Sequence, residues 1–133
     1  MRPPASPTRT SRIDLPKHTL GQAFGFAWQG VRYCYRTQRN FRIELAAGAA
    51  ALTASVWLGR GLAEVALCVM LVLVLEMLNT ALEALVDLVT PDYHPLAKIV
   101  KDTGAGVVLV ASLGSVVVGL IVLGPPLWQR LLG

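Results

Sequence analysis

The sequence predicts an all-helical integral membrane protein in which an amphipathic surface helix precedes three membrane-spanning helices. Of its 133 residues, 54% are hydrophobic and only 15% are charged, whereas about a quarter of the residues in soluble domains are charged. The charged residues also gather between long windows that contain almost none of them. That distribution is typical of a chain whose main solvent is lipid.

The amino-terminal region predicts a tail followed by a surface helix. Residues 1–16 contain four prolines and three arginines but no apolar stretch, so we predict a disordered basic tail there and a single membrane domain over 17–133. Over 17–37, apolar residues recur every three or four positions, aromatic residues lie between them, and Arg32 and Arg36 lie on another side. Such a helix suits the lipid headgroup layer, and the alternative is a soluble amphipathic helix packed on the rest.

Three apolar windows follow and predict the membrane spans. We place these spans at 43–58, 62–88 and 103–123. A tight turn at Gly59, Arg60 and Gly61 joins the first two. Between the second and third spans we predict a loop from Val89 to Lys101, and we expect Pro125 and Pro126 to end the third span.

The distribution of Lys and Arg predicts the orientation of the chain in the membrane. Eight of these residues precede the first span, and Lys98 and Lys101 lie in the loop between the second and third spans. The opposite side has only Arg60 and Arg130. By the positive-inside rule, the amino terminus and this loop are cytoplasmic and the carboxyl terminus is outside. Because topology explains the net charge of +4, we expect no nucleic-acid partner.

A polar stripe in the second span carries the strongest functional signal. Glu76, Asn79, Glu83 and Asp87 are spaced three, four and four residues apart, which places them within an arc of about 80° on a helix. A charged group at the bilayer centre costs ~2.5–3.5 kcal/mol on insertion scales, so this stripe should not face lipid. The spans contain no Lys or Arg to neutralise it. Mg²⁺ would do so, since it takes oxygen ligands and usually arrives with substrate phosphates.

The segment after the stripe adds groups that suit a phosphate. Lys98 and Lys101 supply two cations, and we expect Asp102 to cap the third span. The first amides of that span, near Gly104 and Gly106, would then add positive potential beside an anion. The chain has neither a GxxxxGK[ST] loop nor a kinase Gly-rich loop, so ATP would bind without either cradle.

The run EMLNTALEALVDLVTPDYHPLAKIVKD, from Glu76 to Asp102, resembles the signature of the prokaryotic diacylglycerol kinase and undecaprenol kinase family. The resemblance includes Gly25, Trp28 and the RNFR segment at 39–42, and its PDYHPLAKIVKD part is more similar to the undecaprenol kinase branch. It implies a homotrimer in a prokaryotic cell membrane, with active sites between protomers near the cytoplasmic surface. The implied reaction is ATP-dependent phosphorylation of a lipid alcohol, either undecaprenol or diacylglycerol.

The same resemblance implies a role for each residue of the site. Glu76 matches the catalytic base and Asn79 a polar neighbour of it. Glu83 matches a ligand of the Mg²⁺ that accompanies ATP. Lys101 and Asp102 match nucleotide-contacting residues, and Asp87 matches another acidic position near the site.

One position departs from the family pattern. Where the family usually has a second metal-binding Glu, just before the RNFR segment, this chain has Gln38. A neutral amide can coordinate a metal but removes one charge, so Gln38 is a weaker candidate ligand than Glu83. Glu44 lies six residues further on and is not expected to replace it.

Two readings from other functional classes stay open at this point. A small transporter or channel would use a membrane glutamate to bind cations or protons. A non-enzymatic membrane scaffold would use the polar stripe to hold its protomers together. Neither explains an acidic stripe that leads to Lys101 and Asp102 as well as a lipid kinase does.

Overall fold

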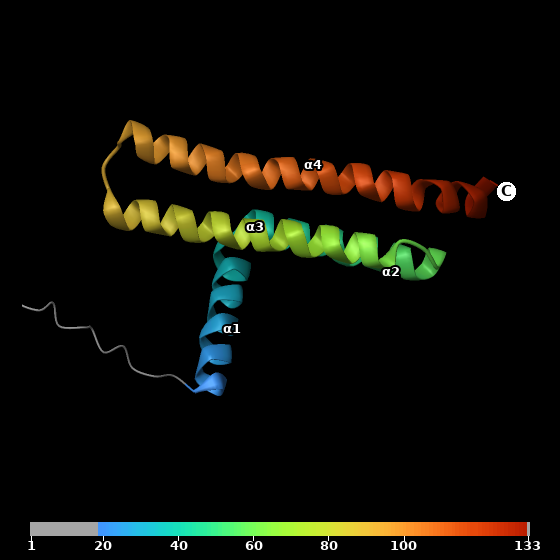
Figure 1. Cartoon of the computed structure of the whole chain (residues 1–133), viewed down its shortest axis with the longest axis horizontal. Coiled ribbons are helices and arrows are strands. Elements are labelled where there is room, and N and C mark those ends of the chain that lie inside the picture. Colours follow the sequence, from blue (N-terminus) through green and yellow to red (C-terminus); the bar gives the residue numbers. More distant parts are fainter. Residues whose placement is uncertain (1–18, 133) are drawn as a thin grey trace, which may run out of the picture.

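The computed structural model describes residues 19–132, and over this range the chain folds into four α-helices. These are α1 (Leu20–Thr37), α2 (Arg39–Leu58), α3 (Leu62–Val89) and α4 (Pro95–Leu132). Helices α2, α3 and α4 run side by side in alternating directions, and α1 projects away from them (Figure 1). The all-helical prediction is confirmed, whereas the predicted tail over 1–16 lies outside the described residues.

Helix α1 is a separate element with a defined start. Thr19 caps it with a capping box, in which the Thr19 hydroxyl accepts from the Gln22 amide at 3.3 Å and the Gln22 side chain accepts from the Thr19 amide at 2.9 Å. Large apolar side chains such as Leu20, Phe24 and Trp28 are exposed along it. The placement of this helix in the headgroup layer stays a prediction.

Helices α2, α3 and α4 are each long and apolar enough to cross a membrane. α3 agrees with the predicted second span to within one residue, while α2 begins four residues before the predicted first span. The turn between them uses Gly59 and Gly61, whose φ angles of 68° and 70° favour glycine. With 28 residues, α3 is about 42 Å long, which exceeds the ~30 Å thickness of the hydrocarbon core of a bilayer.

The predicted loop from Val89 to Lys101 is wrong in length, because α4 already begins at Pro95. Proline suits the first position of a helix, where no amide donor is needed, and His94 Nδ1 accepts from the Leu96 amide at 3.2 Å. Asp102 therefore lies within α4 and does not cap it. The amides near Gly104 lie well inside the helix, where they are not the free amides of a helix start that the anion argument required.

The prediction that Pro125 and Pro126 end the third span is also wrong, since α4 continues through both to Leu132. Two prolines remove two amide donors, but the last turns of α4 gain a tertiary contact. The Arg130 guanidinium donates to the Trp57 carbonyl at 3.1 Å and lies 4.7 Å from the centre of the Trp57 ring. This contact holds the end of α4 against the end of α2.

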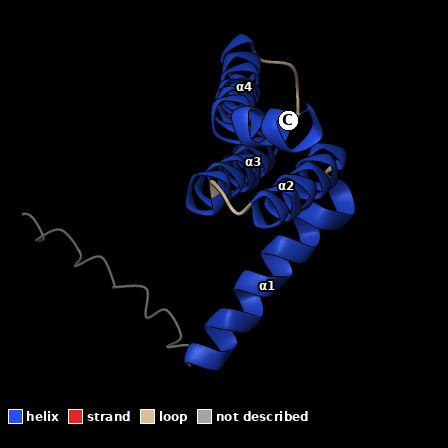
Figure 2. Cartoon of the chain, turned by 90° about the vertical axis from the view of Figure 1, so that its right-hand side faces the viewer, coloured by secondary structure: helices blue, strands red, loops and turns tan. Residues whose placement is uncertain are grey.

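Helix α3 lies between α2 and α4 and packs against both, while α2 and α4 contact each other less (Figure 2). Two glycines allow close packing on α3: a Cβ at Gly48 would collide with Val69, and a Cβ at Gly104 would collide with the Asn79 side-chain oxygen. Most large apolar side chains lie on the outer faces, as expected in lipid. α3 is rotated so that Glu76 and Asn79 of its polar stripe point into the bundle.

Candidate active site

The polar stripe of α3 faces the interior of the helix bundle. Glu76 and Asn79 are 3% and 9% exposed, Glu83 is half-buried, and Asp87 at the end of the helix is exposed. The expectation that these groups avoid lipid is therefore confirmed for Glu76 and Asn79. Their burial carries an energetic cost that partners or a bound ligand must offset.

Glu76, Asn79 and Glu83 line a polar pocket with a volume of about 250 Å³ between α2, α3 and the first half of α4. Its lining residues are Gln38, Asn40, Glu44, Glu76, Asn79, Glu83, Ala105, Val108, Leu109 and Ser112. Four of the residues chosen from the sequence thus meet in one place, namely Gln38, Glu76, Asn79 and Glu83. We call this cavity the polar pocket.

Asn79 is fixed in orientation by its neighbours. Its Nδ2 donates to Glu83 Oε1 at 3.1 Å, one helical turn along α3. Its Oδ1 lies against Gly104 of α4 and is buried without a hydrogen-bond partner in the described part of the chain. A buried acceptor of this kind is costly, and the close packing of Asn79 on α4 depends on the missing Cβ at Gly104.

Glu44 is a residue of the polar pocket that the sequence interpretation considered only as a substitute for position 38 and set aside. It lies on α2, and its Oε2 is buried without a hydrogen-bond partner among residues 19–132. The available signal was a lone glutamate inside an apolar span, which is by itself a sign of a functional site. The predicted first span contained this residue, but only the packing of α2 on α3 and α4 places its carboxylate near those of Glu76 and Glu83.

The charge of the polar pocket suits a cation. Three carboxylates line it, and none of the described residues that line it is Lys, Arg or His. Over residues 19–132, no group of three His, Cys, Asp or Glu side chains is placed to hold a metal ion. Mg²⁺ commonly takes only one or two protein carboxylates together with phosphate oxygens and water, so the carboxylates and amides present fit that ion.

The other three predicted residues lie outside the polar pocket. Asp87 and Lys101 form an ion pair, Oδ1 to Nζ 2.6 Å, that joins the end of α3 to the start of α4. Asp102 pairs with Lys98 on the exposed surface of α4. Exposed pairs contribute only ~0–1 kcal/mol, so both lysines can exchange a carboxylate for a phosphate at little cost.

Comparison with known proteins identifies the family. The sequence pattern described as prokaryotic diacylglycerol kinase matches residues 25–123. A diacylglycerol kinase of Synechocystis is 50% identical over 109 residues, which cover 79% of this chain but 62% of that protein, so the chain spans less than two thirds of that relative.

Two shorter relatives are covered more fully. An undecaprenol kinase of Bacillus subtilis is 38% identical over 80% of this chain and 89% of its own length. A diacylglycerol kinase of Escherichia coli is 36% identical over 77% of this chain and 86% of its own length. The resemblance noted from the Glu76–Asp102 run is thereby confirmed, and the chain belongs to the prokaryotic diacylglycerol kinase family.

Proposed function

We propose that this protein is an ATP-dependent lipid kinase that phosphorylates the hydroxyl group of a membrane alcohol, undecaprenol or diacylglycerol. The observation that carries the proposal is the polar pocket, in which three carboxylates meet within a membrane domain and none of the described lining residues is Lys, Arg or His. Membership of the family supports the same reaction, because the relatives are named as kinases of these two lipids. The three apolar helices and the bacterial relatives make this a prokaryotic membrane protein.

Glu76 is the proposed catalytic base. It accepts the proton of the lipid hydroxyl while a lone pair of the hydroxyl oxygen forms a bond to the γ-phosphorus of ATP. The bond between that phosphorus and the β–γ bridging oxygen breaks, and ADP leaves with its electron pair. Burial of Glu76 within the bundle keeps bulk water from competing with the lipid for the phosphoryl group.

Glu83 is the proposed metal ligand, and Asn79 positions it through the 3.1 Å hydrogen bond. Gln38 is a further candidate oxygen ligand in the same pocket. When bound with ATP, Mg²⁺ would offset the negative charge of the phosphates. Glu44 of α2, which lines the same pocket, would position the incoming hydroxyl.

Lys101, Asp102 and Asp87 are the proposed nucleotide contacts at the cytoplasmic end of the site. Lys101 would exchange its exposed partner Asp87 for a phosphate oxygen. Asp102 and Lys98 lie one turn apart on the same helix, at the same end of the bundle. Asp87, Lys101 and Asp102 would then hold the nucleotide at the carboxyl end of α3 and the start of α4, on the side of the site where Glu83 would hold the metal.

We further propose a homotrimer with the amino terminus and the active site in the cytoplasm and the carboxyl terminus outside. The distribution of Lys and Arg supports this orientation, since ten of the twelve lie ahead of α2, in its first turn, or near the α3–α4 connection. The exposed apolar surface of the single chain leaves room for neighbouring protomers as well as lipid.

Transfer of label tests the proposed function directly. Purified protein in micelles that contain undecaprenol or diacylglycerol should move ³²P from γ-labelled ATP to the extracted lipid, and only with Mg²⁺ present. A transporter or a scaffold would leave the lipid unlabelled. If the protein is folded and neither lipid becomes labelled, the proposed lipid-kinase function is rejected.

Gln38→Glu should strengthen Mg²⁺ binding. The substitution places a fourth carboxylate in the polar pocket at the position where the family usually has one. We expect the Mg²⁺ concentration for half-maximal activity to fall by about 10-fold, because a carboxylate adds a full charge beside the cation. A titration of activity with Mg²⁺ measures this, with Asn40→Asp as the matched control that adds the same charge from the same pocket wall. An unchanged half-maximal concentration for Gln38→Glu would remove residue 38 from the metal site.

A further inference from the structure

Helices α1 and α2 meet at a corner where α1 turns away from the bundle, and Gln38 is the single residue between them (Figure 1). It is the C-cap of α1 and the N-cap of α2, with extended backbone angles of φ −97° and ψ 116°. Its amide donates to the Cys34 carbonyl at 2.8 Å and completes the last turn of α1. We call residues 34–42 the corner.

The side chain of Gln38 takes no part in capping α2. An N-cap side chain ordinarily accepts a hydrogen bond from an amide of the first turn, and Gln38 makes no such bond. Gln38 instead lines the polar pocket. The geometry of the corner therefore decides whether residue 38 is available to a metal ion in that pocket.

Arg42 joins the two helices at the corner. It lies in the first turn of α2, and its Nη1 donates to the Tyr35 carbonyl at 3.1 Å and to the Arg36 carbonyl at 3.2 Å. Both carbonyls belong to the last turn of α1, where a helix has no amides of its own to offer them. A cation is unfavourable at the start of a helix and favourable at the end of one, so Arg42 suits the end of α1 better than the start of α2.

Apolar packing holds α1 to the bundle mainly near the corner. Cys34 is the buried residue of α1, and Phe41 is buried on the other side of the corner. Nearer the middle of α1, Trp28 and Val31 line a cavity of about 860 Å³ between this helix, α2 and α3. With so little close packing along α1, the two hydrogen bonds of Arg42 are a main constraint on how α1 meets α2.

We propose that Arg42 is a positioning residue, which ties the end of α1 to the first turn of α2 and thereby keeps residue 38 in the polar pocket. This inference rests on the proposed function, in which the polar pocket binds the Mg²⁺ that accompanies ATP. Arg42 is exposed and is not among the described residues that line the polar pocket, so it acts through residue 38.

Charge and position predict opposite effects of Arg42→Ala on metal binding. Removal of a nearby positive charge should strengthen the binding of a cation, whereas a corner that no longer holds residue 38 should weaken it. The effect should be clearest in the Gln38→Glu protein, where residue 38 carries a full charge. There, Arg42→Ala should raise the half-maximal Mg²⁺ concentration by roughly 10-fold, which removes the gain expected from Gln38→Glu. The kcat at saturating Mg²⁺ should stay within about 2-fold, because the defect is in binding.

Two further variants separate position from charge. Arg39→Ala removes the same charge from the same turn of α2, at an exposed residue, and should keep or enlarge the gain of Gln38→Glu. Arg42→Lys should keep most of that gain, because one nitrogen of Arg42 serves both carbonyls and a lysine amine can also donate to the last carbonyls of a helix. If Arg42→Ala does not fold, Arg42→Gln takes its place, since its shorter side chain carries no charge.

A readout without turnover follows the corner itself. Hydrogen exchange of peptides that cover residues 34–38, measured by mass spectrometry in detergent, should be roughly 5-fold faster in Arg42→Ala than in the parent or Arg39→Ala, the factor expected for a lost helix cap. Binding of Mn²⁺ with a non-hydrolysable ATP analogue, followed by electron paramagnetic resonance, gives the metal affinity without phosphoryl transfer.

The outcomes separate the positioning role from the proposed function. Suppose that the protein phosphorylates neither lipid, but Arg42→Ala speeds exchange and weakens Mn²⁺ binding in the Gln38→Glu protein. That result would support the role of Arg42 and reject the kinase. Lipid phosphorylation in which Arg42→Ala leaves the gain of Gln38→Glu intact would keep the kinase and overturn the role of Arg42. Absence of any gain from Gln38→Glu would overturn that role as well, because residue 38 would then not meet the metal.

Discussion

Replacement of Glu76 by glutamine is expected to lower lipid phosphorylation by about 10²- to 10⁴-fold, the range that general bases contribute. Glutamine has nearly the same shape and fills the same buried position, but it cannot accept the hydroxyl proton. The loss should appear in kcat at saturating ATP, lipid and Mg²⁺, because the proton moves in the transition state. Assays of ³²P transfer to extracted lipid measure this with purified protein.

Stability should move in the opposite direction to activity. Glu76 shares the polar pocket with Glu44 and Glu83, so neutralising it removes like-charge repulsion in a poorly solvated space. The melting temperature of Glu76→Gln in detergent should therefore equal or exceed that of the parent. A scaffold role predicts the reverse, a loss of stability with no effect on nucleotide turnover.

Glu64→Gln is the matched control for this substitution. Glu64 lies on the same helix, twelve residues or about 18 Å before Glu76, and is exposed. The control should retain parental turnover. Turnover near the parental level in Glu76→Gln itself would remove Glu76 from the role of base.

The part of the site that the sequence could predict is the part that depends on local geometry. Glu76, Asn79 and Glu83 share one face because a helix turns 100° per residue, whatever surrounds it. The cost of charge in lipid then requires that this face point inward, and the structure agrees for Glu76 and Asn79. Gln38 could be added only through its place in the family pattern, before the RNFR segment.

The part that could not be predicted depends on how the helices pack. Glu44 joins the polar pocket because α2 runs antiparallel to α3 and is held close to it at Gly48, and nothing local in the sequence gives that register. The ends of α4 were missed because proline usually interrupts helices. Pro95 instead occupies a first turn, and Pro125 and Pro126 lie in final turns that Arg130 holds to Trp57.

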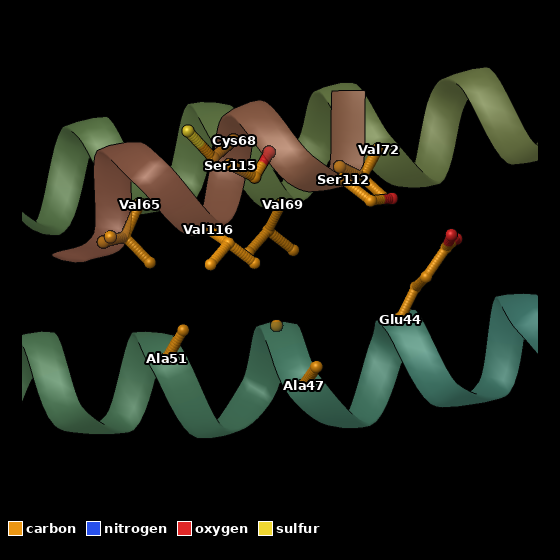
Figure 3. Close-up of a pocket in the computed structure, with 12 residues that line it drawn as sticks. Glu44, Ala47, Ala51, Val65, Cys68, Val69, Val72, Ser112, Ser115 and Val116 are labelled. Carbon is orange, nitrogen blue, oxygen red and sulfur yellow. The ribbon is translucent and has the colours of Figure 1, made fainter. Parts of the chain in front are cut away.

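The same dependence on packing explains why the apolar cavity of the bundle could not be predicted from the sequence. This cavity of about 270 Å³ lies between α2, α3 and α4 (Figure 3), and small residues at Gly119, Ala47 and Ala51 leave it open on two helices that are not consecutive in the sequence. A glycine or alanine in a membrane span ordinarily indicates close helix packing. At Gly48 that is what the structure has, whereas at Gly119 the space stays open.

Glu83→Gln is expected to raise the Mg²⁺ concentration for half-maximal activity by about 10- to 100-fold. Loss of a residue that only hydrogen-bonds to a metal ligand already lowers metal affinity by this factor, and Glu83 is proposed to bind the metal itself. The Asn79 Nδ2 group donates to Glu83 Oε1 at 3.1 Å, and a glutamine oxygen can accept the same bond. The fold should therefore be kept while one negative charge beside the cation is lost. Titration of activity with Mg²⁺ at saturating ATP and lipid measures the shift.

The response to excess Mg²⁺ separates the two glutamates. High Mg²⁺ should restore much of the activity of Glu83→Gln, because the defect is in binding, and should not restore Glu76→Gln, because the missing group moves the proton. A lower melting temperature for Glu83→Gln with an unchanged Mg²⁺ titration would instead indicate that Glu83 only holds helices together.

The double variant Gln38→Glu with Glu83→Gln tests whether α2 and α3 share the metal. It restores three carboxylates to the polar pocket but moves one of them from α3 to the start of α2. Additive effects would give the double variant a half-maximal Mg²⁺ concentration between the parental value and about 10 times that value, because the single changes are about 10-fold down and about 10- to 100-fold up. If both positions contact one Mg²⁺, the measured value should depart from this product. Strict additivity would mean that residues 38 and 83 do not share an ion, and that the charge on α2 acts only at a distance.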